Sequence, residues 1–152
     1  MESSMRPSNA CFALARRFEG LRLTPYADAG GLMTIGWGHR LFSPPFPASI
    51  TEAQAEEWLT ADMDEAALSV TRLVRVPLAQ HELDALSDFV FNLGPSNFQR
   101  SSALALLNGG NRLLSADHLL LWNEANVGGK MQVLPGLTAR REAERQLFLS
   151  GV

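Results

Sequence analysis

EGLRLTPYADAGGLMTIGWGH, residues 19–39, is the stretch of this chain that decides its fold. A glycine pair in its middle is a turn signal, and apolar residues then alternate with small or polar ones. The same stretch begins with Glu19, carries Asp28 nine residues later and carries Thr34 six residues after that. We therefore expect a short, strongly turned antiparallel sheet over residues 21–42, with two acids and a hydroxyl at its edge.

Helical signals flank this sheet on both sides. Apolar residues at helical spacing, together with stop signals, predict helices over about 9–19, 51–75, 79–93, 101–107, 113–125 and 135–149. Thr51 and Gln54 form a capping-box pattern at the start of the second helix, which is the longest. Ser43–Pro47 is a proline-rich loop, and Gly128–Met131 is a small turn between the last two helices.

These elements predict an α+β fold in a single domain, residues 1–152. A small sheet lobe covers about residues 20–50, and a linking helix covers about 51–75. A larger helical lobe covers about 76–152, and the N-terminal helix returns to it. We expect a cleft between the lobes, where the Glu19 segment meets the helical part, because pockets favour such junctions.

Charge and composition exclude several classes of protein. The net charge is −3, so nucleic acid is not an expected partner. Residues 51–90 carry nine acids against two arginines, and we interpret this acidity as a solvated helix face. Cys11 is the single cysteine, which excludes an internal disulfide and fits a reducing cytosol. No segment approaches the ~20 apolar residues of a bilayer span, and residues 1–7 lack a signal-peptide pattern, so we expect cytosolic synthesis and no membrane insertion.

Glu19, Asp28 and Thr34 are the candidate catalytic residues. Hydrolysis of a glycosidic bond needs a proton donor and a second group, usually a carboxylate, that attacks the sugar or activates water. Glu19 lies at the C-terminal end of a predicted helix, where the negative end of the helix dipole disfavours a charged carboxylate, as suits a donor. Taken singly, a glutamate at a helix end is usually solvated, and an aspartate beside two glycines usually shapes a turn. The three residues occurring together favour a catalytic site.

The same stretch resembles the phage-type lysozyme family, glycoside hydrolase family 24. The family pattern is Glu, eight residues, Asp, five residues, Thr and then Ile-Gly-x-Gly-His, which the chain matches from Glu19 to His39. Similar landmarks continue over almost the full length: FVFNLG at 89–94, LNG at 107–109, LW at 121–122 and GLTARREAE at 136–144. The resemblance implies a two-lobed lysozyme-like fold, with the small sheet lobe and the larger helical lobe joined by a long helix.

The resemblance also implies a reaction. Glu19 would donate the proton, and Asp28 with Thr34 would position the attacking water. The implied substrate is the β-1,4 bond between N-acetylmuramic acid and N-acetylglucosamine in the glycan strands of bacterial peptidoglycan. If a water is held beside Asp28, the configuration at the anomeric carbon of the sugar should be inverted. The two catalytic carboxyls are roughly 6.5–9.5 Å apart in inverting enzymes and about 5–5.5 Å apart in retaining ones. We expect Thr34→Ala to weaken or redirect the activity.

Two further contacts are implied by the resemblance. In the family an arginine of the last helix pairs with the catalytic acid; Arg140 is the expected residue here and Arg141 is the competing choice. The alternative for Arg140 is an exposed helix face. An ion pair between His39 and Asp62 on the long helix would make His39 structural, since the chemistry already has its acid and its base.

Arg40, Phe91 and Ser101 match positions where family members contact the sugar chain. An aromatic face suits sugar stacking, and Arg40 can reach an N-acetyl or peptide carbonyl. The alternatives are a solvated arginine, a core phenylalanine and a serine that caps a helix. Ala116 stands where the family presents an asparagine as a further contact, so the far end of the cleft is expected to bind glycan differently. Trp122 is interpreted as core.

His81 and His118 show no partner pattern, and we interpret both as ordinary surface or helix residues. No two histidines and no Cys–His set have metal-ligand spacing. We therefore expect no metal and no other cofactor.

The leading hypothesis is a phage or prophage muramidase that acts as an endolysin in host cell lysis. Without an export signal it would stay in the host cytoplasm until a separate pore-forming protein releases it to the cell wall, and we expect a monomer. One alternative is a lytic transglycosylase, which closes an anhydro ring instead of adding water. Another is a catalytically weak glycan-binding module, for instance in a virion. Asp28 and Thr34, which offer a place to hold water, disfavour the first alternative, and the complete catalytic set disfavours the second.

Overall fold

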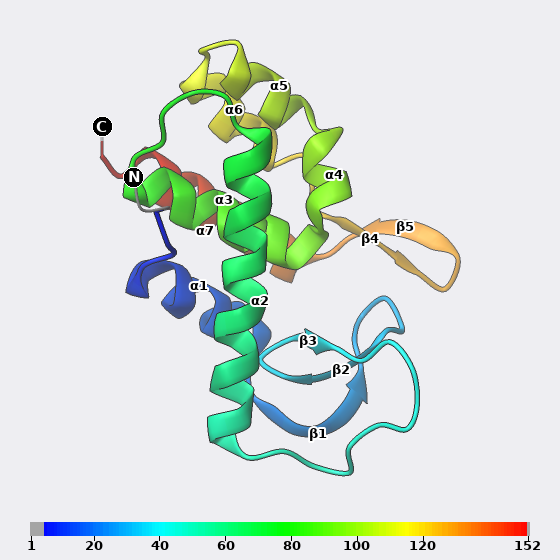
Figure 1. Ribbon diagram of the computed structural model, residues 1–152. Coiled ribbons are helices and arrows are strands. Elements are labelled where there is room, and N and C mark those ends of the chain that lie inside the picture. Colours follow the sequence, from blue (N-terminus) through cyan, green and yellow to red (C-terminus); the bar gives the residue numbers. More distant parts are fainter. Residues whose placement is uncertain (1–4, 152) are drawn as a thin grey trace.

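The computed structural model describes residues 5–151 and has a small sheet lobe below a larger helical lobe (Figure 1). In chain order the elements are α1 (Asn9–Glu19), β1 (Arg22–Ala27), β2 (Met33–Gly36), β3 (His39–Arg40), α2 (Glu52–Leu73), α3 (Gln80–Leu93), α4 (Pro95–Gln99), α5 (Ser102–Asn108), α6 (Arg112–Leu119), β4 (Glu124–Val127), β5 (Lys130–Val133) and α7 (Pro135–Leu149). α1 returns to the helical lobe, where it packs against α3 and α7. The predicted α+β class is confirmed.

The sheet lobe is a three-stranded antiparallel sheet in the order β1-β2-β3. Thr34 on β2 pairs with Tyr26 on β1, and the next residue, Ile35, is fully buried. Gly36 ends β2 with φ of 67°, and a Cβ there would lie 3.4 Å from the Cβ of Ala55 on α2. The absence of a side chain at Gly36 therefore lets the strand end approach α2 closely.

α2 connects the two lobes. Its N-terminus is capped by Thr51, whose Oγ1 accepts a hydrogen bond from the backbone N–H of Gln54 at 3.1 Å, as the capping-box pattern predicts. Its buried residues recur at helical spacing and form one face: Ala55, Leu59, Met63, Ala66, Ala67 and Val70. This face packs on β2 and β3 at one end of the helix and on α3 and α4 further along. The long helix thereby fixes the sheet lobe relative to the helical lobe.

α3 is the central helix of the helical lobe. Nine consecutive residues, Glu82–Val90, are buried, whereas a surface helix would bury only one stripe. α1, α2, α4 and α7 all pack against it. Phe89 on α3 is fully buried and makes edge-to-face contacts with Phe98 and with Trp122, at centroid distances of 6.0 and 6.2 Å. Because α3 is surrounded, any polar side chain on it must find partners inside the protein.

The region after α3 differs from the sequence-based expectation. The helix expected over 113–125 ends at Leu119, and the turn expected at 128–131 belongs to a hairpin of β4 and β5 that projects from the lobe (Figure 1). Gly128 and Gly129, with φ of 60° and 86°, form the tight two-residue turn of this hairpin. α4 was also missed; Gly94, with φ of 88°, ends α3, and Pro95 starts the new short helix.

None of the helices within residues 5–151 is both long enough and apolar enough to cross a membrane. Residues 1–4, on which the expected lack of a signal peptide partly rests, lie outside the described part of the chain.

Candidate active site

Glu19 is the last residue of α1, and its carboxylate is held from the helical lobe. Gly20 ends the helix with φ of 70°, which turns the chain toward β1. Arg140 on α7 donates from Nη1 to Glu19 Oε1 at 2.6 Å, and the side chain of Glu19 is 17% exposed. Of the two arginines weighed from the sequence, Arg140 is therefore the one that contacts the acid, and it is buried rather than on an exposed face.

The second oxygen of Glu19 faces the sheet lobe. A Cβ built on Gly38, which has φ of 77°, would lie 2.5 Å from Glu19 Oε2 and 2.6 Å from its carboxyl carbon. Only a glycine leaves room for the carboxylate at this point, and only glycine adopts this φ at little cost. The collision with the Glu19 carboxylate thus explains why the sequence pattern carries a glycine at position 38, before His39.

Gly38→Ala is expected to lower activity by about 10²-fold, because the new methyl must displace the Glu19 carboxylate and a misplacement of ~1 Å can cost that much. The measurement is the initial reaction rate of equal amounts of folded protein. Gly110→Ala is the matched control, since Gly110 has φ of 88° but nothing within 4 Å of its Cβ position. Equal losses in both variants would show backbone strain rather than collision with Glu19.

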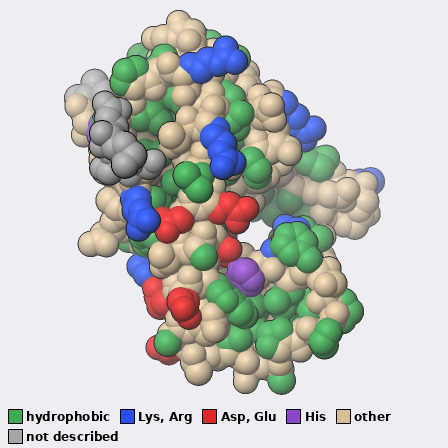
Figure 2. Space-filling view, in the orientation of Figure 1, with side chains coloured by type: hydrophobic (Ala, Val, Ile, Leu, Met, Phe, Trp, Pro, Cys, Tyr) green, Lys and Arg blue, Asp and Glu red, His purple; other side chains and the backbone are tan. Residues whose placement is uncertain are grey.

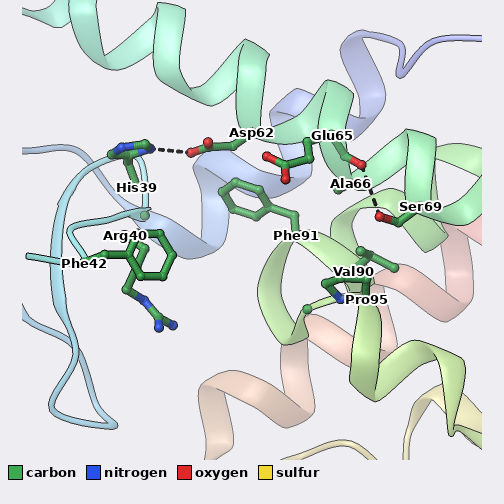
Figure 3. Close-up of a pocket in the computed structure, with 12 residues that line it drawn as sticks. His39, Arg40, Phe42, Asp62, Glu65, Ala66, Ser69, Val90, Phe91 and Pro95 are labelled. Carbon is green, nitrogen blue, oxygen red and sulfur yellow. Dashed lines mark hydrogen bonds and ion pairs between the residues drawn. The ribbon is translucent and has the colours of Figure 1, made fainter.

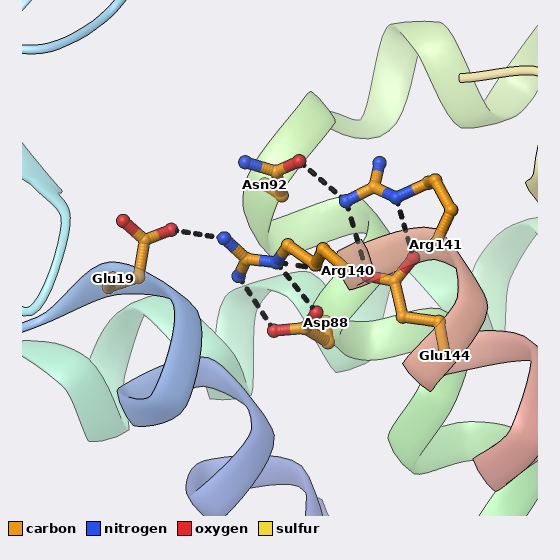
Figure 4. A network of polar contacts seen from close by, with 6 residues as sticks. All are labelled: Glu19, Asp88, Asn92, Arg140, Arg141 and Glu144. Carbon is orange, nitrogen blue, oxygen red and sulfur yellow. Dashed lines mark hydrogen bonds and ion pairs between the residues drawn. The ribbon is translucent and has the colours of Figure 1, made fainter. Parts of the chain in front are cut away.

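Arg140 is shared between Glu19 and a buried aspartate, Asp88 on α3 (Figure 4). Its Nε donates to Asp88 Oδ2 at 2.9 Å and its Nη2 donates to Asp88 Oδ1 at 2.8 Å. Next to this pair, Arg141 contacts Glu144 at 2.8 Å and donates to Asn92 Oδ1 at 2.6 Å. The side chains of Asp88, Arg141 and Glu144 are completely buried.

The two buried carboxyls of this cluster titrate differently. Burial alone would raise the pKa of Asp88, but the charge of Arg140 and hydrogen bonds with Glu144 and Arg140 outweigh it and hold that pKa below its usual value. Burial raises the pKa of Glu144 well above its usual value, and the neighbouring Asp88 raises it further against the charges of Arg141 and Arg140. Asp88 is therefore the carboxyl of the pair that loses its proton more readily.

Asp28 and Thr34 lie at the turn between β1 and β2. Asp28 Oδ1 accepts from the backbone N–H groups of Gly30 at 2.9 Å and Leu32 at 2.8 Å, so the carboxylate shapes the turn. Thr34 is 4% exposed, and its Oγ1 donates to the backbone carbonyl of Leu32 at 2.8 Å. Thr34 can therefore hold a water only as an acceptor, because its single proton is already used.

A cavity of about 290 Å³ lies between the two lobes, and its lining includes Gly38 but not Glu19, Asp28 or Thr34. Its walls are residues 38–42 of the sheet lobe, one side of α2 and the end of α3, as Figure 3 shows. Figure 2 shows that the surface is hollowed between the lobes. Gly38 and Phe91 connect the cavity to the acid, since Gly38 abuts Glu19 and the Phe91 ring centroid lies 5.9 Å from the guanidinium carbon of Arg140. The predicted position of a cleft at the lobe junction agrees with this cavity.

The family model described as phage lysozyme matches residues 16–144, which include every residue of this site. The chain belongs to the phage lysozyme family. It is 37% identical over 146 residues to an endolysin of Acyrthosiphon pisum secondary endosymbiont phage 1, a match that covers 96% of this chain and 99% of that protein. It is 40% identical over 139 residues to an endolysin of Salmonella phage P22, covering 89% and 92% of the two chains.

A solved structure gives the same result. The endolysin from Escherichia coli O157:H7 phage FAHEc1 matches with a TM-score of 0.87 and 34% identity, over 100% of this chain and 98% of that chain. Membership of the phage lysozyme family makes the protein an enzyme of the glycoside hydrolase class.

In this lysozyme His39 and Asp62 form the ion pair expected between β3 and α2. His39 Nδ1 lies 2.7 Å from Asp62 Oδ2, and the imidazole stacks on Trp58 at a centroid distance of 4.5 Å. The pair spans the wall of the cavity in Figure 3. It ties a two-residue strand to the long helix.

His39→Asn is expected to lower the free energy of unfolding by about 1–2 kcal/mol, because it removes a part-buried hydrogen bond to Asp62 and a stacking contact with Trp58. Thermal unfolding followed by circular dichroism measures the loss. Activity per folded molecule should remain close to wild type, and the Asp62→Asn variant should show the same pattern. A large loss of activity without a loss of stability would instead make His39 catalytic.

The residues predicted to bind the sugar chain lie in two hollows. Arg40 and Phe91 line the cavity beside Glu19. Ser101 lies elsewhere, in a hollow of about 600 Å³ that also includes Trp122, beside the β4–β5 hairpin. Ser101 caps α5 as its alternative interpretation states: its Oγ accepts from the N–H of Leu104 at 3.1 Å and donates to the carbonyl of Phe98 at 2.7 Å.

The structure corrects one minor expectation, for Trp122, and adds detail to those for the two remaining histidines and Ala116. Trp122 is only partly buried and lines the second hollow as well as packing on the core. Both remaining histidines have partners: His81 bonds the carbonyl of Phe148 and His118 bonds Ser102 Oγ, each at 2.8 Å. Ala116 is fully buried, so this position makes no direct contact in the cleft.

Asp88, Glu144 and Asn92 were missed as members of the site. A signal existed for Asp88, because it is an acid inside the apolar run of a predicted helix, and such a residue needs a partner. Within residues 5–151, no cluster of three or more His, Cys, Asp or Glu side chains is arranged to hold a metal ion.

Proposed function

We propose that this lysozyme is a muramidase that hydrolyses the β-1,4 bond between N-acetylmuramic acid and N-acetylglucosamine in bacterial peptidoglycan, with Glu19 as the general acid. The observation that supports this most is the placement of the Glu19 carboxylate. Arg140 occupies Oε1, while Oε2 lies where Gly38 has no side chain, at the edge of the inter-lobe cavity. A proton on Oε2 is thus available to a glycosidic oxygen in that cavity.

Asp28 and Thr34 are proposed to hold the attacking water. Both backbone hydrogen bonds to Asp28 go to Oδ1, so Oδ2 can accept a proton from a water. Thr34 can accept the second proton of that water while its own proton stays on Leu32. In this arrangement the water attacks from the side opposite the leaving oxygen, and the product is inverted.

Glycan binding is proposed to use the inter-lobe cavity first. The ring of Phe91 forms part of its wall, and Arg40 lies across from it on β3 (Figure 3). An aromatic face and a guanidinium suit the apolar face and the carbonyl groups of an N-acetyl sugar. Ser101 is proposed to mark a further glycan subsite in the hollow near the hairpin. Its hydroxyl proton is already donated to the carbonyl of Phe98.

The proposed role in the cell is that of an endolysin acting in host lysis as a monomer. This role is supported by the endolysins that the chain resembles over nearly their whole length. Release to the cell wall is proposed to depend on a separate pore-forming protein.

The test is digestion of purified peptidoglycan, followed by borohydride reduction and mass spectrometry of the released fragments. Reduced N-acetylmuramic acid at the new ends is the expected result. Reduced N-acetylglucosamine would assign the other glycosidic bond, and 1,6-anhydro ends would assign a lytic transglycosylase. Retained binding to the glycan without any release would identify a binding module.

A further inference from the structure

Arg140 donates hydrogen bonds to two carboxylates through three different nitrogens, and its Nε also lies 4.0 Å from Glu144 Oε2. Nε and Nη2 form a two-pronged contact with Asp88 at 2.9 and 2.8 Å, and Nη1 points to Glu19 at 2.6 Å. Asp88 is completely buried, and the side chain of Arg140 is 4% exposed. A planar guanidinium bound at both prongs to a carboxylate cannot rotate without breaking two charged hydrogen bonds. The direction of Nη1 is therefore set from α3, which does not itself carry the catalytic acid.

We propose that Asp88 is a positioning residue of the reaction, which fixes Arg140 and balances its charge so that Glu19 is held in place and can still carry its proton. This inference rests on the proposed role of Glu19 as the acid. Asp88 acts through Arg140 and does not touch the substrate.

The charge balance follows from the contacts. A guanidinium beside Glu19 alone would favour the ionised carboxylate, which cannot donate a proton. In the structure Arg140 donates two hydrogen bonds to Asp88 and one to Glu19, so Asp88 balances much of the positive charge of Arg140.

Other charged or titratable groups face the same cluster. Arg141 and Glu144 on α7 and Cys11 on α1 lie near Asp88, and Tyr26 on β1 lies near Glu19. Burial and the negative charge of Glu19 both raise the pKa of Tyr26, so it is neutral at neutral pH. Burial also raises the pKa of the Cys11 thiol, with Asp88 adding to the effect, so Cys11 is neutral too. Glu144 Oε2 lies 4.0 Å from Arg140 Nε, whereas Asp88 accepts two hydrogen bonds of 2.9 and 2.8 Å, so Asp88 is the main carboxylate that offsets the charge of Arg140 on the α3 side.

The test compares Asp88→Asn with Asp84→Asn. Asp84 is one turn away on the same helix, is 1% exposed and accepts hydrogen bonds from the Ser8 N–H at 2.8 Å and from Gln80 Nε2 at 2.9 Å. Both variants therefore lose a buried, hydrogen-bonded carboxylate of α3, but only Asp88→Asn changes the partner of Arg140. The readouts are kcat, KM and the pH dependence of kcat/KM for peptidoglycan hydrolysis.

For Asp88→Asn we expect kcat to fall about 10–100-fold with KM within about twofold, since the loss lies in positioning the acid. We also expect the alkaline limb of kcat/KM to move to lower pH by about one unit, because the unbalanced guanidinium favours ionised Glu19. Asp84→Asn should keep the wild-type kcat per folded molecule, and the alkaline limb of its kcat/KM should stay at the wild-type pH.

The opposite results overturn the inference. If Asp88→Asn keeps the wild-type limb and loses no more kcat than Asp84→Asn, Asp88 is only structural. If Asp88→Asn does not fold, Asp88→Glu takes its place, because it keeps the charge while its longer side chain must move Arg140. We then expect kcat to fall while the alkaline limb of kcat/KM stays at its wild-type pH. A wild-type kcat in Asp88→Glu would overturn the inference. A wild-type enzyme that releases no reducing ends would instead reject the proposed function itself.

Discussion

Glu19→Gln is expected to lower the rate of peptidoglycan hydrolysis by about 10²–10⁴-fold, the usual contribution of a positioned general acid. Glutamine has the shape of glutamate, so its carbonyl can still accept from Arg140 Nη1 where Glu19 Oε1 does now. It has no acidic proton to give to the leaving oxygen. Initial rates at equal concentrations of folded protein measure the effect.

The fold should survive this substitution. Arg140 keeps its two hydrogen bonds to Asp88, so no buried guanidinium is left without a carboxylate. Thermal unfolding should show a melting temperature near wild type, and Glu142→Gln, at an exposed position of α7, is the matched control with wild-type activity. Substantial residual activity in Glu19→Gln would reject Glu19 as the acid.

Asp28→Asn and Asp28→Ala are each expected to lower the rate by about 10²–10⁴-fold, because either change removes the base that activates water. The two variants separate chemistry from structure. Asparagine keeps an oxygen that can accept from the N–H groups of Gly30 and Leu32, whereas alanine loses both turn hydrogen bonds. Asp28→Asn should therefore be as inactive as Asp28→Ala but more stable to heating.

Two outcomes would contradict this role for Asp28. An active Asp28→Asn with an inactive Asp28→Ala would mean that Asp28 only shapes the turn. The product anomer gives a second check: the sugar released by the wild-type enzyme should first appear in the inverted configuration by nuclear magnetic resonance, and a retained configuration would mean that no water attacks directly.

Much of the sheet lobe and of the site was predictable because the signals are local. The turn signal at Gly30-Gly31 and the alternation after it predicted the short antiparallel sheet, although burial does not alternate there, since Thr34 and Gly36 are buried together with Ile35. The capping pattern at Thr51 marked the start of α2 correctly. The family pattern of the Glu19 stretch ends at Gly38 and His39, and both line the inter-lobe cavity.

The hairpin after α6 was not predictable from periodicity. Leu119, Leu121 and Ala125 continue an apolar pattern that reads as a longer helix. The chain instead leaves the helix at Leu119 and turns back at Gly128-Gly129, because the glycines allow a tight hairpin there. A short apolar run does not distinguish helix from strand on its own.

The buried polar cluster was beyond local reasoning for a different reason. Arg140 and Arg141 are adjacent in sequence, and which of them meets Glu19 depends on how α7 is rotated against α3. Arg140 accordingly lies on the side of α7 that faces Asp88, to which it donates two hydrogen bonds, and Arg141 points toward Glu144 and Asn92 (Figure 4). Asp88 and Asn92 lie 52 and 49 residues from their arginine partners along the chain, so only the packed structure brings them together.

The central claim is that Glu19 protonates the leaving oxygen while water adds to the sugar. Digestion of peptidoglycan in ¹⁸O-labelled water by the wild-type enzyme and by Glu19→Gln tests it directly, with mass spectrometry of the freshly cut ends before the label exchanges. We predict one ¹⁸O atom at each new N-acetylmuramic acid end with the wild-type enzyme, and almost no new ends with Glu19→Gln. Unlabelled anhydro ends, or labelled ends formed equally well by Glu19→Gln, would contradict the claim.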